Sequence, residues 1–591
     1  MAIAAACQSW FAEMSLRPRQ VWLRRRVRSS ELALIAVAIL IGAAAGLLSV
    51  VQGALARTLQ HLLYDLPADE RLSGAVRLPW TVLIALPVGG AILASFSLLT
   101  RARQRALVDT VEANALHGGQ MSWTDSLIVS AQTIISNGFG ASVGLEAAYA
   151  QLGGAIASVT GQWLTLRRSD LRTLVGAGTG AAIGAAFGAP LAGAFYAYEI
   201  VLGAYTPATI APVAAAALAG VLVAQILGAQ PYLIDATAGL PVETHHYLIY
   251  GGLGAIAAGV GIVLMRTVGE VERAARRLPV RPALLPVIGG LLLIPLAFLT
   301  PQVLSAGHGA LHLDLEWGVP LGFLAAVFIV KCAASAISLG FGFRGGLFFA
   351  SLFLGSLLGH LFAGGLNTVA GFAVVDPRNA ALVGMAALAV AVVGGPFTMA
   401  MLVLEATHNF SLTGAVIAAA LVSSAVAREG FGYSFSTWRL HLRGETIRSA
   451  RDIGWARSLT AGRLMRPVAM PLPDSMPIRA FREQAPLGST SRTVLVDEDG
   501  RYSGILQTAA AYVESAGSDD PVRLLAVNKD VALGPGDSIH EIMAMFDIAA
   551  ADELAVVGAD GAVLGILSEA YTRRRYAEEL EKSQRELFRE N

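Results

Sequence analysis

Long hydrophobic runs separated by short polar stretches dominate the chain from Leu32 to about Ala427. Continuous apolar segments cover 32–51, 80–99, 211–227, 248–265, 283–299, 319–339 and 411–427. A run of about 20 apolar residues is long enough for a helix to cross the hydrocarbon core of a bilayer. The pattern therefore predicts a mainly α, polytopic α-helical membrane domain over 31–438.

Two glycine-rich stretches, 131–200 and 341–405, break this regular pattern. They are apolar but are interrupted by glycines and by Pro190 and Pro396. Broken helices at membrane depth are tolerated only where they are buried in protein or line a cavity. Their occurrence in corresponding places predicts an inverted-repeat transporter with halves at about 31–227 and 246–438.

The two ends of the chain are polar. Residues 1–30 form a basic segment whose arginines are expected to keep the N-terminus in the cytoplasm. After the membrane domain, 439–458 reads as a polar linker and 459–577 as a soluble α/β module. Short strands are expected at 493–496 and 554–557, and 578–591 is expected to form a charged helical tail.

Composition supports the membrane assignment and excludes other classes. The chain is 55% hydrophobic and 15% charged, whereas a soluble domain averages about 25% charged residues. The formal net charge is 0, which gives no reason to predict a nucleic-acid partner. Cys7 and Cys332 are the only cysteines, so we predict no disulfide framework, no metal and no cofactor.

One carboxylate stands out inside the apolar region. Glu146 lies in the segment GLEAAYAQLGG at 144–154, directly before a predicted helix. An intramembrane carboxylate is costly and marks a functional site by default. The N-terminus of a helix stabilises negative charge, so the same place would suit a carboxylate or a halide in competition. The alternative is a structural glutamate that pairs with a distant arginine.

Further motifs follow in a fixed order and carry a family resemblance. They are AFGAPLAG at 186–193 with Glu199 downstream, GLFFA at 346–350, LVLE at 402–405 with Thr407 and Asn409, and GYS at 432–434. Together with GLEAA at 144–148, this set resembles the CLC chloride channel and transporter family over about 30–440. The trailing module resembles the CBS-domain pair that many members carry.

The resemblance implies a function and a set of site residues. Glu146 matches the gating glutamate, and Leu347 and Phe348 match positions whose backbone N–H groups bind the anion. Tyr433 matches the tyrosine whose hydroxyl contacts the central anion. The family further implies a homodimer with one anion pathway in each subunit, in the inner membrane of a bacterium, with both termini cytoplasmic and with chloride or a similar small anion as the substrate.

The chain departs from the family pattern at several positions. Leu145, Ala147 and Ala148 replace the Arg, Gly and Pro of the G-R-E-G-P signature, and Ala350 replaces the Pro of G-x-F-x-P. Nothing between 105 and 110 resembles the G-S-G-I-P stretch, so the residue that replaces its serine stays open.

The proton pathway of the family is also altered. Family exchangers carry a proton-transfer glutamate where this chain has Ile200. Glu199, its neighbour, is a candidate for a proton path but would project about 100° away on a helix.

The C-terminal module divides into two CBS-like motifs at about 459–514 and 525–577. Each contains a strand followed by a helix start, GIL at 504–506 and GILS at 565–568. The Asp that would hold a ribose is absent after both strands, so we predict no nucleotide-binding residues. A role in dimerisation and packing is favoured over adenine-nucleotide binding.

Three functions remain after these observations. The favoured one is channel-like or weakly proton-coupled anion transport gated by Glu146. The alternatives are a coupled chloride/proton antiporter, and a membrane sensor whose degenerate pore anchors the CBS pair. The G-x-S-x-G match at 140–144 lies in an apolar passage without a nearby histidine, so a hydrolase is rejected and we predict that the protein is not an enzyme.

Overall fold

The computed structural model describes residues 26–28, 30–67, 70–100, 107–229, 239–311, 320–442, 459–468, 471–513 and 517–588. The chain forms two compact units, Met1–Asp452 and Ile453–Asn591. Most of the basic N-terminal segment, residues 101–106 and the predicted linker from 443 onward lie outside the described residues.

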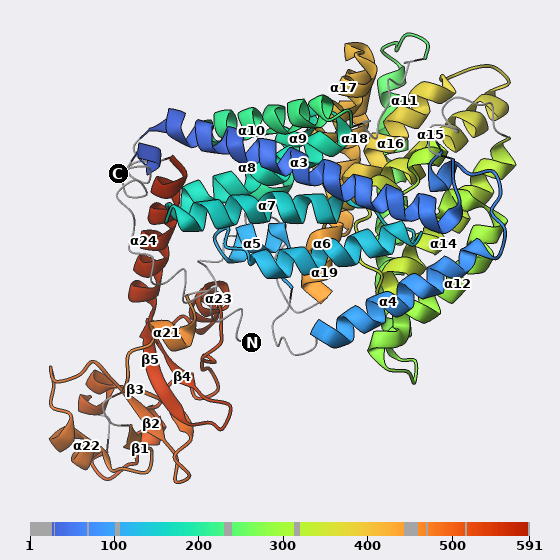
Figure 1. Ribbon diagram of the computed structural model, residues 1–591. Coiled ribbons are helices and arrows are strands. Elements are labelled where there is room, and N and C mark those ends of the chain that lie inside the picture. Colours follow the sequence, from blue (N-terminus) through green and yellow to red (C-terminus); the bar gives the residue numbers. More distant parts are fainter. Residues whose placement is uncertain are drawn as a thin grey trace. The chain divides into compact units, whose positions relative to one another are not determined.

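The first unit is built from helices (Figure 1). Its first half contains α3 (Glu31–Tyr64), α4 (Ala85–Thr100), α5 (Thr110–Leu116), α6 (Trp123–Gly138), α7 (Glu146–Trp163), α8 (Arg168–Phe187), α9 (Pro190–Tyr196), a π-helical segment (Ala197–Leu202) and α10 (Pro207–Ile226). Two short 3₁₀ helices, Leu72–Gly74 and Val82–Ile84, precede α4.

The second half repeats this order of elements. It contains α11 (His246–Arg276), α12 (Leu285–Leu299), α14 (Leu321–Gly340), α15 (Phe348–Ala370), α16 (Pro377–Val393), α17 (Pro396–Thr407), α18 (Phe410–Gly430) and α19 (Phe435–Leu442). Short 3₁₀ helices, Pro282–Leu284 and Pro301–Val303, flank α12.

Helix packing follows the same repeat. In the first half α3 packs against α10 and α7 against α8; in the second, α11 packs against α18 and α15 against α16. The halves meet where α4 packs on α12 and α9 packs on α17. This pairing is the inverted-repeat architecture that the broken glycine-rich stretches predicted.

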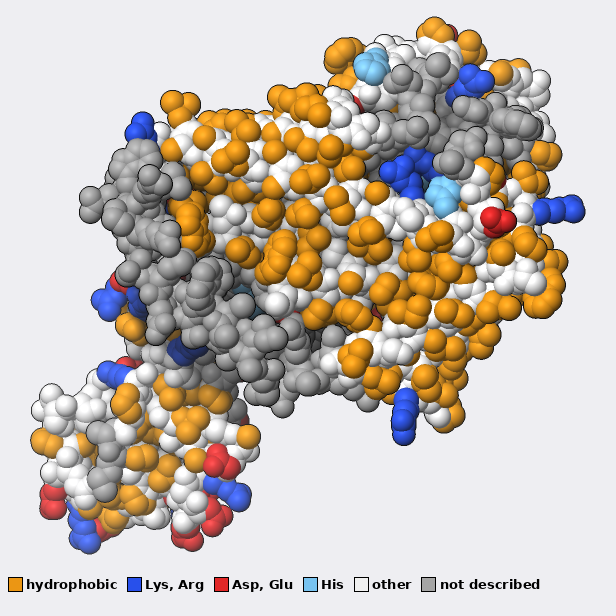
Figure 2. All heavy atoms as spheres, in the orientation of Figure 1, with side chains coloured by type: hydrophobic (Ala, Val, Ile, Leu, Met, Phe, Trp, Pro, Cys, Tyr) orange, Lys and Arg blue, Asp and Glu red, His pale blue; other side chains and the backbone are white. Residues whose placement is uncertain are grey.

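The apolar character of the unit matches a lipid-facing surface. Among the described residues, eight helices are long and apolar enough to cross a membrane. Seven of them correspond to the continuous runs predicted from sequence, and the eighth, Phe348–Ala370, lies inside the interrupted stretch 341–405. On the face in Figure 2, hydrophobic side chains cover most of the described surface of this unit.

The short helices α9 and α17 begin at the predicted breaks. Gly188 ends α8 in the left-handed region, and Pro190 occupies the first turn of α9. Gly394 and Gly395 both have positive φ before Pro396 starts α17. Glycine accepts these backbone angles at little cost, and proline is favoured in a first turn because its missing N–H would be unpaired there.

The second unit is an α/β module of two similar parts. It contains α21 (Ala461–Leu464), β1 (Leu472–Pro473), α22 (Ile478–Gln484), β2 (Arg492–Val496), β3 (Tyr502–Gln507), α23 (Ile539–Ala549), β4 (Glu553–Val557), β5 (Val563–Ser568) and α24 (Glu569–Phe588). Two 3₁₀ helices, Thr508–Tyr512 and Val522–Leu525, lie between β3 and α23. Strand β1 pairs with β2 in parallel, whereas β2–β3 and β4–β5 are antiparallel hairpins.

The two hairpins repeat one another in detail. Both β2 and β4 bury their three central residues, and both hairpins carry a bulge before the last residue of the first strand. Val494 and Ile505 of one hairpin form a buried cluster with Ala555 and Ile566 of the other. The predicted strands are confirmed within one residue, and this duplicated α/β pattern is the one expected of a CBS pair.

Candidate functional site

Glu146 begins helix α7, and its side chain is only 3% exposed. The backbone N–H groups of Glu146 itself and of Phe349 in α15 interact favourably with its carboxylate. The second oxygen, Oε2, accepts no hydrogen bond from the residues that the structure describes. The carboxylate therefore lies between the N-terminal ends of α7 and α15, where free N–H groups and helix dipoles favour negative charge.

The loops that precede these two helices are joined directly. Gly144 donates its N–H to the carbonyl of Gly346 at 3.0 Å, and Gly346 donates back to Gly144 at 3.3 Å. Each half of the repeat thus contributes one strand-like segment to a single antiparallel bridge. The bridge brings Glu146 beside Leu347 and Phe348, which the sequence placed about 200 residues apart.

The absence of a side chain at Gly144 makes room for the carboxylate. A Cβ added at Gly144 would lie 1.9 Å from Oε2 of Glu146, far inside van der Waals contact. A Cβ added at Gly346 would lie 3.5 Å from the same oxygen, an ordinary contact distance. Gly144 therefore permits the observed position of the carboxylate, and Gly346 does not limit it.

A buried polar network supports the loop before Glu146. Ser142 contacts two residues of α14, because its hydroxyl lies 3.0 Å from Ser335 Oγ and its N–H is 2.9 Å from Ser338 Oγ. One turn earlier on α14, the fully buried Lys331 donates to the carbonyls of Val303 and Ser305 at 3.0 and 2.8 Å. These contacts fix the backbone that presents Glu146.

Lys331 is a residue that the sequence reasoning missed. It stands alone as a charged residue in the apolar run 319–339, and a charge inside such a run is a recognisable signal. Ser305 extends its network, since Ser305 Oγ accepts from Asn137 Nδ2 at 2.9 Å, and Asn137 in turn donates to the Val143 carbonyl at 2.7 Å. The chain of contacts ends one residue before Gly144.

Two cavities adjoin this site. The smaller has a volume of about 120 Å³ and is lined by residues including Ala147 and Gly346, which neighbour Glu146 and Leu347 in the chain. The larger has a volume of about 390 Å³ and is lined by α5, the π-helical segment and the ends of α16 to α19. Val111 and Ser436 line both cavities, so the two spaces meet there.

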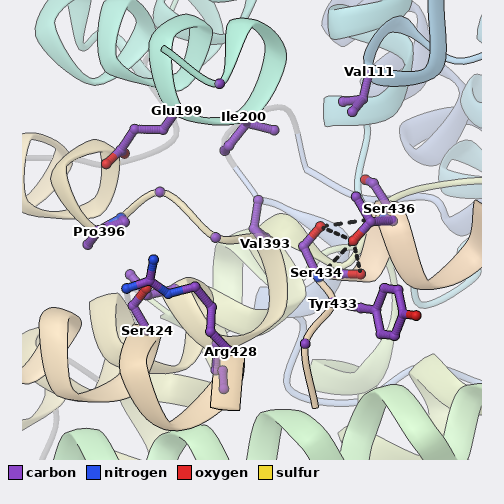
Figure 3. A pocket seen from close by; sticks show the side chains of 18 of the residues that line it. Val111, Glu199, Ile200, Val393, Pro396, Ser424, Arg428, Tyr433, Ser434 and Ser436 are labelled. Atoms are coloured by element: carbon purple, nitrogen blue, oxygen red, sulfur yellow. Dashed lines mark hydrogen bonds between the residues drawn. The ribbon is translucent and has the colours of Figure 1, made fainter. Parts of the chain in front are cut away.

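The larger cavity contains Glu199, Ile200, Arg428 and Tyr433 (Figure 3). In this view Glu199 points towards the start of α17, and Ile200 points away from it. Oε1 of Glu199 accepts from the N–H of Phe397 at 3.1 Å. Oε2 accepts from the N–H and the hydroxyl of Thr398 at 2.8 and 2.6 Å. Glu199 thus caps helix α17 while its neighbour Ile200 lines the cavity.

Glu405 makes the matching contact in the opposite direction. Its two carboxylate oxygens accept from the N–H groups of Leu191 and Ala192, at the start of α9, at 2.7 and 2.9 Å. Glu199, which follows α9, therefore caps the start of α17. Glu405, near the end of α17, caps the start of α9. This reciprocal capping uses the same anion-binding property of helix N-termini as the Glu146 site.

The structure does not bring Tyr433 together with Leu347 and Phe348. The Tyr433 hydroxyl lies 3.3 Å from Nδ1 of His441, and the two rings stack at 4.7 Å. Of the described residues, Phe435 rather than Tyr433 lines the smaller cavity. Gly432, with φ of 82°, turns the chain immediately before Tyr433.

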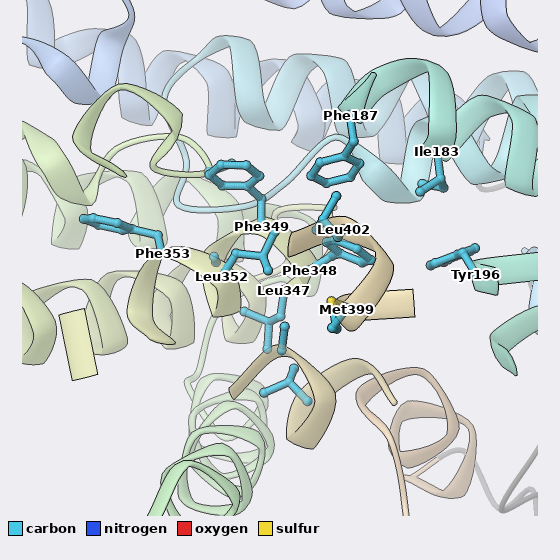
Figure 4. Packing of buried hydrophobic residues seen from close by; sticks show 14 of the residues in the cluster. Ile183, Phe187, Tyr196, Leu347, Phe348, Phe349, Leu352, Phe353, Met399 and Leu402 are labelled. Atoms are coloured by element: carbon cyan, nitrogen blue, oxygen red, sulfur yellow. The ribbon is translucent and has the colours of Figure 1, made fainter. Parts of the chain in front are cut away.

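Leu347 and Phe348 lie in a tightly packed aromatic cluster (Figure 4). The Phe348 ring packs on Phe187 at 5.1 Å and on Tyr196 at 5.9 Å between centroids. Phe349 stacks on Phe187 at 6.1 Å and on His308 at 3.7 Å. This packing fixes the first turn of α15, whose backbone reaches Glu146.

The described residues contain no group of three or more His, Cys, Asp or Glu that could hold a metal ion. The chemistry that the site offers comes from one buried carboxylate, helix N-termini and cavity-lining polar groups. Backbone carbonyls, N–H groups and polar side chains are the groups that coordinate permeating ions in selectivity filters.

The fold and this site define a polytopic helical membrane protein of inverted-repeat construction. A family model for the voltage gated chloride channel matches residues 89–428. The chain belongs to this family and is an integral membrane protein, which confirms the resemblance found in the sequence motifs.

Individual relatives agree with this assignment. A Ralstonia nicotianae protein named as a ClcB-like chloride channel protein is 32% identical over 397 residues, covering 64% of this chain and 90% of that protein.

Solved structures show the same fold. A slow cyanobacterial Cl⁻/H⁺ antiporter is 23% identical, with a TM-score of 0.60 over 69% of this chain and 97% of the other. A eukaryotic CLC transporter is 18% identical, with a TM-score of 0.59 over 90% of this chain and 97% of the other.

Proposed function

We propose that this protein carries chloride or a similar small anion across a membrane, through a pathway inside each subunit that Glu146 gates. The observation that carries the proposal is the buried Glu146 carboxylate between the N-termini of α7 and α15, beside a cavity. A carboxylate and a halide both satisfy these N–H groups, so they exclude one another from the site.

The gating step follows from this competition. When Glu146 is ionised, its carboxylate occupies the position between the helices and blocks the anion. When it is protonated, the neutral side chain gains less from the helix dipoles and leaves. Backbone N–H groups at Leu347 and Phe348 then donate hydrogen bonds to the anion. The anion arrives through the larger cavity, which Tyr433 lines.

We favour channel-like or weakly proton-coupled movement over tight exchange. Ile200 lines the larger cavity and cannot carry a proton. Glu199, the nearest carboxylate in sequence, is engaged with three hydrogen-bond donors at the start of α17. Protonation of Glu199 in a proton relay would weaken these contacts, because a neutral carboxyl is a poorer acceptor than a carboxylate.

A coupled antiporter is the second candidate. It is favoured by the fold shared with a structure described as a Cl⁻/H⁺ antiporter. Both candidates place the protein in the inner membrane as a homodimer with cytoplasmic termini. The CBS pair then serves packing and dimerisation.

Chloride efflux from liposomes that contain the purified full-length protein tests the proposal. We expect valinomycin-dependent chloride release that is absent from protein-free vesicles. Loss of that release in folded, dimeric protein would reject anion transport and favour a sensor with an inactive pore.

A further inference from the structure

Tyr196 is the last residue of helix α9, and its side chain is only 8% exposed. Its ring packs against Phe348 at 5.9 Å between centroids. In Figure 4 the side chain points from the end of α9 towards the cluster around Phe348. Tyr196 also lines the smaller cavity together with Ala147 and Gly346. It therefore stands at the junction of α9, α7 and α15, beside the gating carboxylate.

The Tyr196 hydroxyl has no hydrogen-bond partner among the residues that the structure describes, although the side chain is more than nine-tenths buried. Its neighbour Tyr198 contrasts with it, because the Tyr198 hydroxyl donates to the Ile210 carbonyl at 2.8 Å. Buried hydroxyls are nearly always hydrogen-bonded, since leaving one unpaired is costly. The Tyr196 hydroxyl is therefore available to donate a hydrogen bond to a group inside the cavity that Tyr196 lines.

The charges on the cavity wall favour an anion as that group once Glu146 is neutral. The carboxylates of Glu146 and Asp109 lie within electrostatic range of Tyr196 and disfavour an anion there while both are ionised. Asp109 also lines the cavity, as do Arg344 and Arg439, so cationic side chains outnumber anionic ones on its wall. The volume of about 120 Å³ holds a small anion with water beside it, since one water needs on the order of 10–15 Å³ of accessible space.

Other aromatic residues near the pathway do not supply this hydroxyl. Phe435 lines the same cavity and is buried, but it has no donor. Tyr433 lines the larger cavity, and its hydroxyl lies 3.3 Å from His441 Nδ1. Of these three residues, Tyr196 is the tyrosine that lines the cavity next to Glu146.

We propose that Tyr196 donates the side-chain hydrogen bond that holds the permeating anion beside Glu146, and so sets anion affinity at this position. This inference rests on the proposed transport function and specifies its site. The hydroxyl donates to the anion when the Glu146 side chain has left. A phenolic O–H is neutral, so it stabilises the anion without the strong attraction that would stop the anion from leaving.

Chloride binding measured by calorimetry on the purified full-length protein tests this role. The parent is E146Q, because a neutral side chain no longer competes with chloride for the site. We expect E146Q/Y196F to bind chloride with a Kd about ten-fold higher, the effect of losing one hydrogen bond to a charged group. The matched control, E146Q/Y198F, removes a hydroxyl that bonds to backbone and should leave the Kd unchanged.

The outcomes separate the two proposals. An unchanged chloride Kd in E146Q/Y196F overturns the role of Tyr196 and leaves the anion-transport proposal intact. A ten-fold higher Kd in E146Q/Y433F, with no change in E146Q/Y196F, has the same consequence. If E146Q itself neither binds nor releases chloride, the transport proposal falls, and the Tyr196 proposal falls with it.

A second measurement covers the case in which Y196F does not fold. 3-Fluorotyrosine placed at position 196 of E146Q keeps both the ring and the hydroxyl. We expect its ¹⁹F resonance to move on titration with chloride and to saturate with the calorimetric Kd. A resonance that chloride does not move would overturn the proposal.

Discussion

Gly144 and Gly346 donate their backbone N–H groups to each other's carbonyl oxygens, at N···O distances of 3.0 and 3.3 Å. This two-way contact ties the loop before α7 to the loop before α15, so both halves of the repeat build one site. Both glycines face Oε2 of Glu146, but at different distances. An added Cβ would come within 1.9 Å of this oxygen at Gly144 and would lie 3.5 Å from it at Gly346.

Gly144→Ala should therefore displace the Glu146 carboxylate without removing it. Neither glycine has the positive φ that disfavours an alanine, and the clashing atom is the end of a flexible side chain. We expect G144A to lose most of the pH dependence of chloride flux. The matched control, G346A, should keep it, because its Cβ would lie 3.5 Å from the same oxygen. Equal pH profiles in G144A and the parent protein would contradict this account of the site.

The reciprocal caps predict a structural role for Glu199. Glu199→Ala removes the acceptors for two N–H groups and one hydroxyl at the start of α17. We expect a loss of stability of about 1–2 kcal/mol, the typical effect of deleting a helix cap. Thermal unfolding in detergent should register it, and Glu405→Ala should give a similar loss at α9.

Glu199→Gln separates this role from proton transport. The amide keeps an acceptor oxygen but cannot carry a proton. We expect E199Q to be more stable than E199A and to transport chloride at the parent rate. Abolished proton movement in a fully stable E199Q would instead assign Glu199 to a proton path.

Weak proton coupling follows from Ile200 and from the engaged Glu199. Vesicles with an imposed chloride gradient, and with voltage clamped by valinomycin and potassium, should show chloride movement without sustained uphill proton pumping. External pH recorded during efflux is the readout. Uphill pumping with a fixed stoichiometry would establish the antiporter.

Glu541 gives the CBS unit a pH dependence of definite sign. Hydrogen bonds from the Ser538 backbone N–H and hydroxyl lower the pKa of this carboxyl at the start of α23. A carboxyl whose pKa is lowered in the folded state stabilises that state at every pH above the ordinary carboxyl pKa. This stabilisation is lost as the pH falls through the lowered pKa. The protection factors of the first α23 amides in the full-length protein, that is, their intrinsic exchange rates divided by the observed rates at the same pH, should therefore fall at acidic pH. E541A should have lower protection factors at neutral pH, and these should change less on acidification.

The sequence was sufficient for the helix pattern and for the strands of the C-terminal unit. Seven apolar runs became helices of membrane-spanning length. The strands of the C-terminal unit appear within one residue of their predicted bounds. Glu146 begins a helix, close to the predicted position directly before one, and Phe348 begins the corresponding helix of the second half. The span Phe348–Ala370 was not predicted as a separate helix, because it lies within the glycine-rich stretch 341–405.

The inner part of the site depended on contacts between distant segments. The caps made by Glu199 and Glu405 join residues about 200 positions apart, and no local pattern carries them. Phe435, and not Tyr433, lines the smaller cavity, and the chain turns at Gly432 immediately before Tyr433. Tyr196 has no sequence signal in its apolar surroundings, since the role proposed for it depends on a hydroxyl left unpaired after folding.

The pH profile of chloride flux through Glu146→Gln tests the central claim most directly. The substitution keeps the shape of the side chain but fixes it in a neutral form. The purified parent and E146Q are compared in liposomes from acidic to neutral pH. The account predicts that flux through the parent falls as pH rises, because the carboxylate ionises and returns between α7 and α15, whereas E146Q conducts at a nearly constant rate. Parallel profiles for the two proteins would contradict the assignment of Glu146 as the gate.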